Sequence, residues 1–141
     1  MSVLNPYLNF RGQAREALEF YHGVFGGDLT VSSFADLGGM DLPEGESDQV
    51  MHGQLETPAG FTLMAADVPG HMDFAAGTNQ YSISLSGPSD DDAQLRGYWQ
   101  KLGEGGTITE PLATAPWGAS FGMLTDRFGV NWLVNIAADA A

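Results

Sequence analysis

The stretch PYLNFRGQAREALEFYHGVFGG, residues 6–27, decides the fold of this chain, because it joins a strand pattern to a helix pattern. Its first part completes an alternating segment over residues 3–10, whose apolar and polar positions fall on opposite faces of a predicted strand. Residues 13–25 predict an amphipathic helix, since apolar side chains recur there every three or four positions. These positions are Ala14, Ala17, Leu18, Tyr21, Val24 and Phe25. Two glycines, Gly26 and Gly27, end the helix, because glycine adopts the left-handed conformation of a C-cap without steric cost.

Three more strands are expected in the rest of the first half. A strand at 29–35 is followed by an acidic, glycine-containing surface loop at 36–47. The segments 49–57 and 61–66 predict a hairpin around a turn that contains proline and glycine. A second loop, at 67–79, is then expected to join the two halves of the chain.

The second half repeats this order. A strand is expected at 80–86, and a helix begins near Ser89, which with Asp92 resembles a capping box, and ends at Gly103. Short strands follow at 106–109, 119–125 and 130–136, with a turn at Asp126–Gly129 between the last two. The fold class is therefore α+β, with the order β-α-β-β-β occurring twice. We interpret 1–141 as a single domain, with module one at 1–68, a joint at 69–79 and module two at 80–141.

Charge and composition exclude several classes of function. The chain has 141 residues and a formal net charge of −13, with only five lysines and arginines. Such a surface repels phosphate, so we expect no nucleic-acid partner and no membrane partner. The chain has no cysteine, which excludes disulfides, thiolate metal sites and a catalytic cysteine. Because the first residues lack a signal-peptide pattern, we expect a cytoplasmic protein.

Three strings resemble a known superfamily. They are the opening stretch at 6–27, VMHG at 50–53 and DRFGVNW at 126–132. Together with the element order, they resemble the vicinal-oxygen-chelate superfamily of glyoxalases, bleomycin-resistance proteins and dioxygenases, and within it the PhnB-like branch. Members of that branch have been labelled glyoxalase-like proteins or demethylubiquinone methyltransferases. The resemblance implies two modules that form an eight-stranded, U-shaped cleft, and a homodimer, but the fold alone selects no reaction.

The resemblance also implies a divalent metal, held by His and Glu on the first and last strand of each module. Those positions fall at Asn5 (or Tyr7 in a shifted register), Ser82, Met64 and Leu133. None of these residues offers an imidazole or a carboxylate, so we expect no metal at this site and no cofactor. His52 and Glu56, on one face of a strand, leave open an atypical site with displaced ligands.

The candidate ligand-binding residues are Asn5, Tyr7, His52, Gln54, Ser82 and Trp117. The first five lie in strand segments whose polar positions carry almost no charge, and uncharged donors and acceptors are what a small-molecule pocket uses to orient its ligand. Trp117 lies between Pro116 and Gly118, a loop context in which an aromatic side chain could border a cleft or an interface. No nucleophile or phosphate-loop motif is present, so no catalytic residue is assigned.

Three hypotheses follow for function. The first is a small-molecule-binding protein of the glyoxalase and bleomycin-resistance fold that lacks the usual divalent metal. The second is a metal-dependent lyase, isomerase or dioxygenase with displaced ligands that include His52 and Glu56. The third is a drug-sequestering resistance protein, in which the acidic surface attracts a cationic compound. The sequence does not decide between binding and catalysis.

Overall fold

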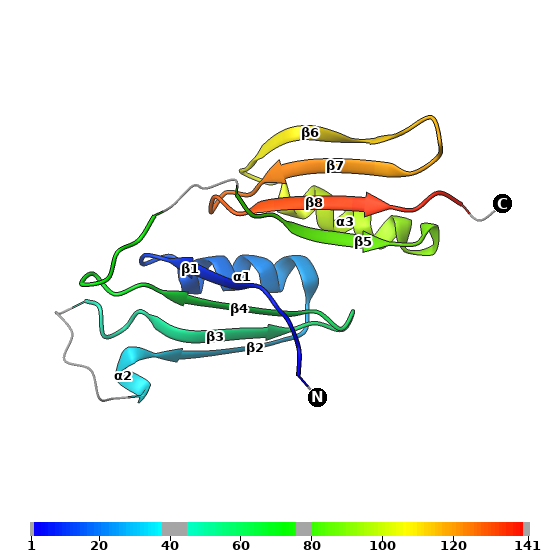
Figure 1. Ribbon diagram of the computed structural model, residues 1–141. Helices are drawn as coiled ribbons and strands as arrows, with labels where there is room; N and C mark the ends of the chain where they lie inside the picture. Colours follow the sequence, from blue (N-terminus) through cyan, green and yellow to red (C-terminus); the bar gives the residue numbers. More distant parts are fainter. Residues whose placement is uncertain (1, 38–44, 76–79, 140–141) are drawn as a thin grey trace. The chain divides into compact units, whose positions relative to one another are not determined.

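The computed structural model describes residues 2–37, 45–75 and 80–139, which fold into two compact units, Met1–Ala76 and Gly77–Ala141 (Figure 1). Each unit has one four-stranded mixed sheet and one main helix. Within the described residues, no helix is long and apolar enough to cross a membrane.

The first unit has the strand order β1-β4-β3-β2, with β1 parallel to β4 and the other pairs antiparallel. Its elements are β1 (Tyr7–Phe10), α1 (Ala14–Phe25), β2 (Asp28–Ser33), α2 (Phe34–Leu37), β3 (Val50–Glu56) and β4 (Thr62–Asp67). The helix α1 packs against β2, β3 and β4 on one face of the sheet (Figure 1). The buried residues of α1 are the six apolar positions that the sequence predicted. One face of the sheet is thereby covered, and the other is left for polar side chains.

A glycine pair fixes the turn from α1 into β2. Gly27 has a φ of +97°, and a Cβ placed there would lie 2.0 Å from the backbone oxygen of Glu56. Only glycine allows both this left-handed conformation and the close approach of the end of β3. The sequence prediction that the helix ends at this pair is therefore confirmed by the structure.

A buried carboxylate ties α1 to the sheet. Asp67, at the end of β4, is only 4% exposed. Its Oδ1 accepts hydrogen bonds from the backbone N–H groups of Gly12 (2.8 Å) and Ala14 (3.0 Å), at the start of α1. Its Oδ2 accepts from the N–H of Val50, at the start of β3, at 3.0 Å. Asp67 thus supplies, from a distant strand, the acceptor that an N-cap side chain would otherwise supply to the helix.

The second unit repeats the topology with the strand order β5-β8-β7-β6, in which β5 is parallel to β8. Its elements are β5 (Ile83–Gly87), a 3₁₀ turn η1 (Ser89–Asp91), α3 (Asp92–Leu102), β6 (Thr107–Thr114), β7 (Ser120–Thr125) and β8 (Asn131–Ile136). The helix α3 packs against β5 and β8. The predicted α+β class with two β-α-β-β-β modules is confirmed. The module bounds and the cleft between the modules stay predictions.

The predicted turn at Asp126–Gly129 also contains a buried carboxylate. Asp126 is 4% exposed, and its Oδ1 accepts from the N–H groups of Phe128 (2.8 Å) and Val130 (3.1 Å). Its Oδ2 accepts from the indole N–H of Trp132 at 2.9 Å. This arrangement explains why aspartate begins the turn and why a tryptophan can be buried in β8 with its N–H satisfied.

Several predicted boundaries were wrong for identifiable reasons. β1 begins at Tyr7 rather than at residue 3, because the Pro6 carbonyl, which accepts from Met64 N–H, is where pairing with β4 starts. The strand expected at 29–35 stops at Ser33, where the α2 turn begins. At the start of the second helix, the capping-box contact expected of Ser89 is not made, because Ser89–Asp91 forms a 3₁₀ turn.

The strand expected at 106–109 extends to Thr114 as β6, despite a proline within it. An edge strand tolerates proline because one side of its backbone has no sheet partner. The strand expected at 80–86 is shifted and lies at Ile83–Gly87. Of the predicted loop at 36–47, residues 38–44 lie outside the described part of the chain.

Candidate functional site

The face of the first sheet opposite α1 carries polar side chains from β1, β3 and β2 in register with Met64 of β4. Tyr7 in β1 pairs with Met64 in β4, which pairs with Gln54 in β3, which in turn pairs with Thr30 in β2. His52 lies beside Ser32 two residues along β3. Since alternate residues of a strand point to opposite faces, the residues next to them, such as Leu8 and Leu55, point toward α1.

Four side chains on this face form a continuous chain of hydrogen bonds, which we call the polar row: Tyr7, His52, Gln54 and Glu56. The Tyr7 hydroxyl lies 3.4 Å from Nδ1 of His52, and the two rings are 6.0 Å apart between centroids. Nε2 of His52 lies 3.4 Å from Oε1 of Gln54. The Gln54 amide donates to Oε1 of Glu56 at 3.3 Å. The row therefore joins β1 to β3, although 45 residues separate Tyr7 from His52.

The carboxylate of Glu56, at the end of the polar row, determines which partner donates in each hydrogen bond of the row. An ionised Glu56 can only accept, so the amide nitrogen of Gln54 donates to it and the amide oxygen faces His52. Nε2 of neutral His52 then carries the proton and donates, while Nδ1 accepts from the Tyr7 hydroxyl. The oxygen of Tyr7 keeps lone pairs that can accept a hydrogen bond from a bound molecule.

The structure brings together three of the six predicted ligand-binding residues, Tyr7, His52 and Gln54. Asn5 lies just before β1, half-buried, and its amide donates to the carbonyl of the adjacent Pro6 at 3.1 Å. The other two belong to the second unit and are described there. Glu56, which the sequence suggested only as an alternative metal ligand, completes the row, and its position two residues beyond Gln54 on the same strand face was the available signal.

Ser82 and Trp117 lie at opposite ends of the second sheet. Ser82 is exposed and directly precedes β5. Trp117 is 78% exposed in the turn between β6 and β7, just before β7 begins. The start of β7 lies level with the end of β8 and the end of β5, so Trp117 lies near the end of β5, whereas Ser82 lies before its start. The second unit therefore does not bring these two candidates into one site.

The open face of the second sheet mixes small hydroxyls with apolar side chains. The hydroxyls of Ser84 and Ser86 lie 3.0 Å apart on β5. Phe121 and Met123 on β7 are 43% and 36% exposed, and neither takes part in the buried core beneath α3. This face offers apolar contact with few polar anchors, in contrast to the polar row of the first unit.

The positions implied for a divalent metal do not fit one. In the parallel pairs, Tyr7 lies opposite Met64, and Ser84 lies opposite Leu133. The register thus corrects the expectation for Ser82, since Ser84 is the residue beside Leu133. A phenol, a thioether, a hydroxyl and an alkyl chain do not provide the imidazole and carboxylate set of a divalent site. Across residues 2–37, 45–75 and 80–139, no group of three or more His, Asp or Glu side chains could hold a metal ion.

The repeated β-α-β-β-β units define the class of protein, the glyoxalase, bleomycin-resistance and dioxygenase fold. Solved members of this group share the fold at low sequence identity, for example 15% for a domain from Frankia sp. EAN1pec with a TM-score of 0.67, so this likeness concerns the fold alone. Within that class, the profile of the family described as 3-demethylubiquinone-9 3-methyltransferase matches residues 2–135, and the chain belongs to this family.

Individual relatives agree with this assignment. The chain is 38% identical to protein PA1353 from Pseudomonas aeruginosa, with a TM-score of 0.82 and coverage of 99% of this chain and 100% of that one. It shares its fold with a PhnB protein from Bacillus cereus, described as a putative 3-demethylubiquinone-9 3-methyltransferase, at 24% identity, with a TM-score of 0.73 and coverage of 96% of this chain and 100% of that one. Protein YjdN from Escherichia coli is 26% identical over 94% of both chains. The resemblance to the PhnB-like branch is confirmed.

Proposed function

We propose that this protein binds a small, polar, non-anionic molecule through the polar row, without a divalent metal. The observation that supports this most directly is the continuous hydrogen-bonded chain from Tyr7 to Glu56 on the sheet face opposite α1. Side chains that are ordered on strands and already bonded to one another lose little freedom when a ligand arrives. The row ends in the Glu56 carboxylate and contains no lysine or arginine, so this site disfavours an anion.

The assignment of donors and acceptors along the row specifies that the ligand must donate a hydrogen bond to Tyr7. Because the Tyr7 hydroxyl donates to His52, its oxygen accepts, and the ligand contributes an O–H or N–H group at that point. Met64, between Tyr7 and Gln54 in the register, contributes an apolar contact. Asn5, Ser82 and Trp117 stay predicted ligand contacts. Each is tested by its own alanine substitution in the same binding screen.

A binding screen with two histidine variants tests the proposal. Wild type, His52→Ala and His71→Ala are compared by amide NMR spectra against a set of neutral polar compounds. His71 is an exposed loop residue and serves as the matched control. We expect His52→Ala to weaken binding about tenfold and His71→Ala to leave it unchanged. Equal affinities for the three proteins would show that the polar row does not hold the ligand.

The hydrogen-bond direction has its own test. In long-range ¹⁵N–¹H spectra of the free protein, we expect the proton on Nε2 of His52. The variant Glu56→Gln replaces an acceptor with a group that can donate or accept, so a mixture of the two His52 tautomers is expected. An unchanged tautomer in that variant would contradict the assigned direction.

The same samples separate the alternative functions. A stoichiometric divalent metal in purified wild type would overturn the metal-free proposal, and its loss in His52→Ala would favour an enzyme with displaced ligands. Tight binding of a cationic glycopeptide would favour drug sequestration.

We also propose a cytoplasmic homodimer. Light scattering at micromolar concentration should then give twice the chain mass of 15.0 kDa, and a monomer mass would contradict it.

A further inference from the structure

The second unit contains a pocket on the helix-covered side of its sheet, opposite the face that carries Phe121 and Met123. The pocket has a volume of about 440 Å³ and lies between α3 and the edge strand β6. Arg96, Trp99 and Gln100 border it from α3, and Ile108 and Leu112 border it from β6. The pocket is shallow and widely open to solvent, although its volume falls in the range of small-molecule sites, roughly 300–1,000 Å³.

Irregular pairing of β6 shapes this pocket. The register between β6 and β7 shifts between Ile108 and Glu110 and again between Glu110 and Ala113. Bulges of this kind bend a strand and redirect its side chains. A Cβ at Gly122 of β7 would lie 2.7 Å from the tip of the Trp99 indole and 2.8 Å from Cα of Leu112. The indole and the bulged strand therefore rest directly on Gly122, and the pocket wall is well packed.

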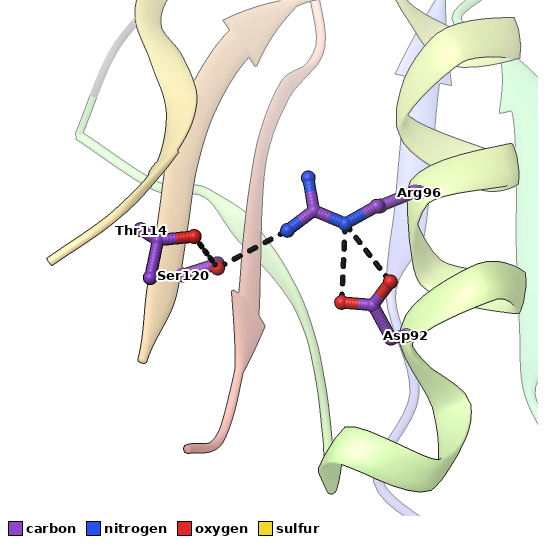
Figure 2. Close-up of polar contacts among 4 residues, drawn as sticks. All are labelled: Asp92, Arg96, Thr114 and Ser120. Carbon is purple, nitrogen blue, oxygen red and sulfur yellow. Dashed lines mark hydrogen bonds and ion pairs between the residues drawn. The ribbon is translucent and has the colours of Figure 1, made fainter. Parts of the chain in front are cut away.

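A guanidinium at this pocket is held by both the helix and the sheet (Figure 2). Nε of Arg96 donates to both carboxylate oxygens of Asp92, at 3.1 and 3.0 Å, and Nη2 donates to the hydroxyl of Ser120 at 3.2 Å. Ser120 is buried and its oxygen lies 2.9 Å from that of Thr114 on β6. Three contacts thus fix the guanidinium, although the Arg96 and Asp92 side chains are 42% and 46% exposed.

One nitrogen of this guanidinium remains available. Within the described part of the chain, Nη1 of Arg96 has no hydrogen-bond partner, and Figure 2 shows it directed away from both Asp92 and Ser120. Arginine donates but cannot accept, so a ligand atom that meets Nη1 must be an acceptor. A pre-ordered cation of this kind favours a carboxylate over a neutral acceptor.

We propose that this pocket binds a small monocarboxylate with an apolar or aromatic body. The carboxylate would meet Arg96, and the body would lie on the Trp99 indole between Ile108 and Leu112. Glu104, which also borders the pocket, disfavours a second negative charge on the ligand. The site is independent of the polar row, because it lies on another unit and recognises an anion, whereas the polar row takes a non-anionic ligand.

A pair of related probes tests the site. Indole-3-acetate carries the carboxylate, and indole-3-acetamide has nearly the same shape without the charge. We expect indole-3-acetate to shift the indole N–H signal of Trp99 saturably, and the amide to bind about tenfold more weakly. Arg96→Gln should weaken indole-3-acetate binding by about the same factor. Lys101→Gln removes the same charge from an exposed position of the same helix and should have little effect.

Three results would overturn the proposal. The first is an unshifted Trp99 indole N–H signal up to about 10 mM indole-3-acetate, a range that includes millimolar affinities. The second is equal affinity for indole-3-acetate and indole-3-acetamide. The third is equal weakening of indole-3-acetate binding by Arg96→Gln and Lys101→Gln. Because a half-exposed ion pair contributes little to stability, Arg96→Gln should stay folded. If it does not, Arg96→Lys keeps the charge but loses the planar donor set, and unchanged affinity in that variant would also overturn the proposal.

Discussion

Replacing Asp67 by asparagine tests how the first unit is held together. In the native protein, Oδ1 accepts from the N–H groups of Gly12 and Ala14, and Oδ2 accepts from Val50. Asparagine has nearly the same shape, so its oxygen can keep the first two bonds. Its NH₂ group then faces the N–H of Val50, donor against donor, at a site that is 4% exposed.

The expected loss of stability follows from these contacts. One buried N–H without an acceptor costs about 1–3 kcal/mol, and the two remaining bonds lose the assistance of the charge, so we expect about 2–4 kcal/mol in total. For a chain of this length, that corresponds to a fall in Tm of roughly 10 °C.

Urea unfolding followed by circular dichroism measures the effect of Asp67→Asn. The matched control is Asp28→Asn, which makes the same chemical change at an exposed position at the start of β2. The control should stay within about 0.5 kcal/mol of wild type. If Asp67→Asn also stayed within that range, the carboxylate would not be the link between α1 and the sheet, and the reasoning would be refuted.

Two further predictions concern local conformation. Gly27→Ala should destabilise the protein by more than about 2 kcal/mol in urea unfolding, because it combines a positive φ with a backbone clash. Gly23→Ala, in the last turn of α1 with open space around it, should be neutral or stabilising by up to about 1 kcal/mol, and the reverse order would contradict this account. Hydrogen bonds from the backbone and hydroxyl of Ser33 lower the pKa of Asp36. Their stabilisation of the start of α2 is therefore fully present above the unfolded pKa of Asp36, and it is lost as the pH falls through the folded pKa, below about pH 4. In an NMR titration, Ser33→Ala should raise the pKa of Asp36 part of the way toward its usual value, since the backbone hydrogen bond remains, and an unchanged pKa would contradict the contribution of the hydroxyl.

Local patterns carried much of the fold. The spacing of Leu18, Tyr21 and Val24 predicts α1 because helix periodicity depends only on neighbouring turns, and these residues are buried as predicted. The α2 turn escaped prediction because its capping box, Ser33 with Asp36, lies at the end of a strand pattern and uses aspartate in place of the usual glutamate.

The candidate site was predicted in part. Tyr7, His52 and Gln54 were selected because they are uncharged polar residues in strand segments, a property visible in the sequence. That they touch depends on the parallel pairing of β1 with β4, which places Tyr7 level with Gln54 across Met64. No property of the individual strands specifies this register, so the grouping of these three without Ser82 could not be derived from the chain alone.

The sequence by itself determined the order of the strands and the two main helices, the buried face of α1 and the family, since these depend on residues that are close together along the chain. The tertiary structure decided which distant residues meet: Asp67 with the start of α1, Tyr7 with His52, and Arg96 with Ser120. The physical reason is that such contacts form only after strands have paired in one register and helices have packed on one face, and a shift of one residue would turn every side chain of a strand to the opposite face.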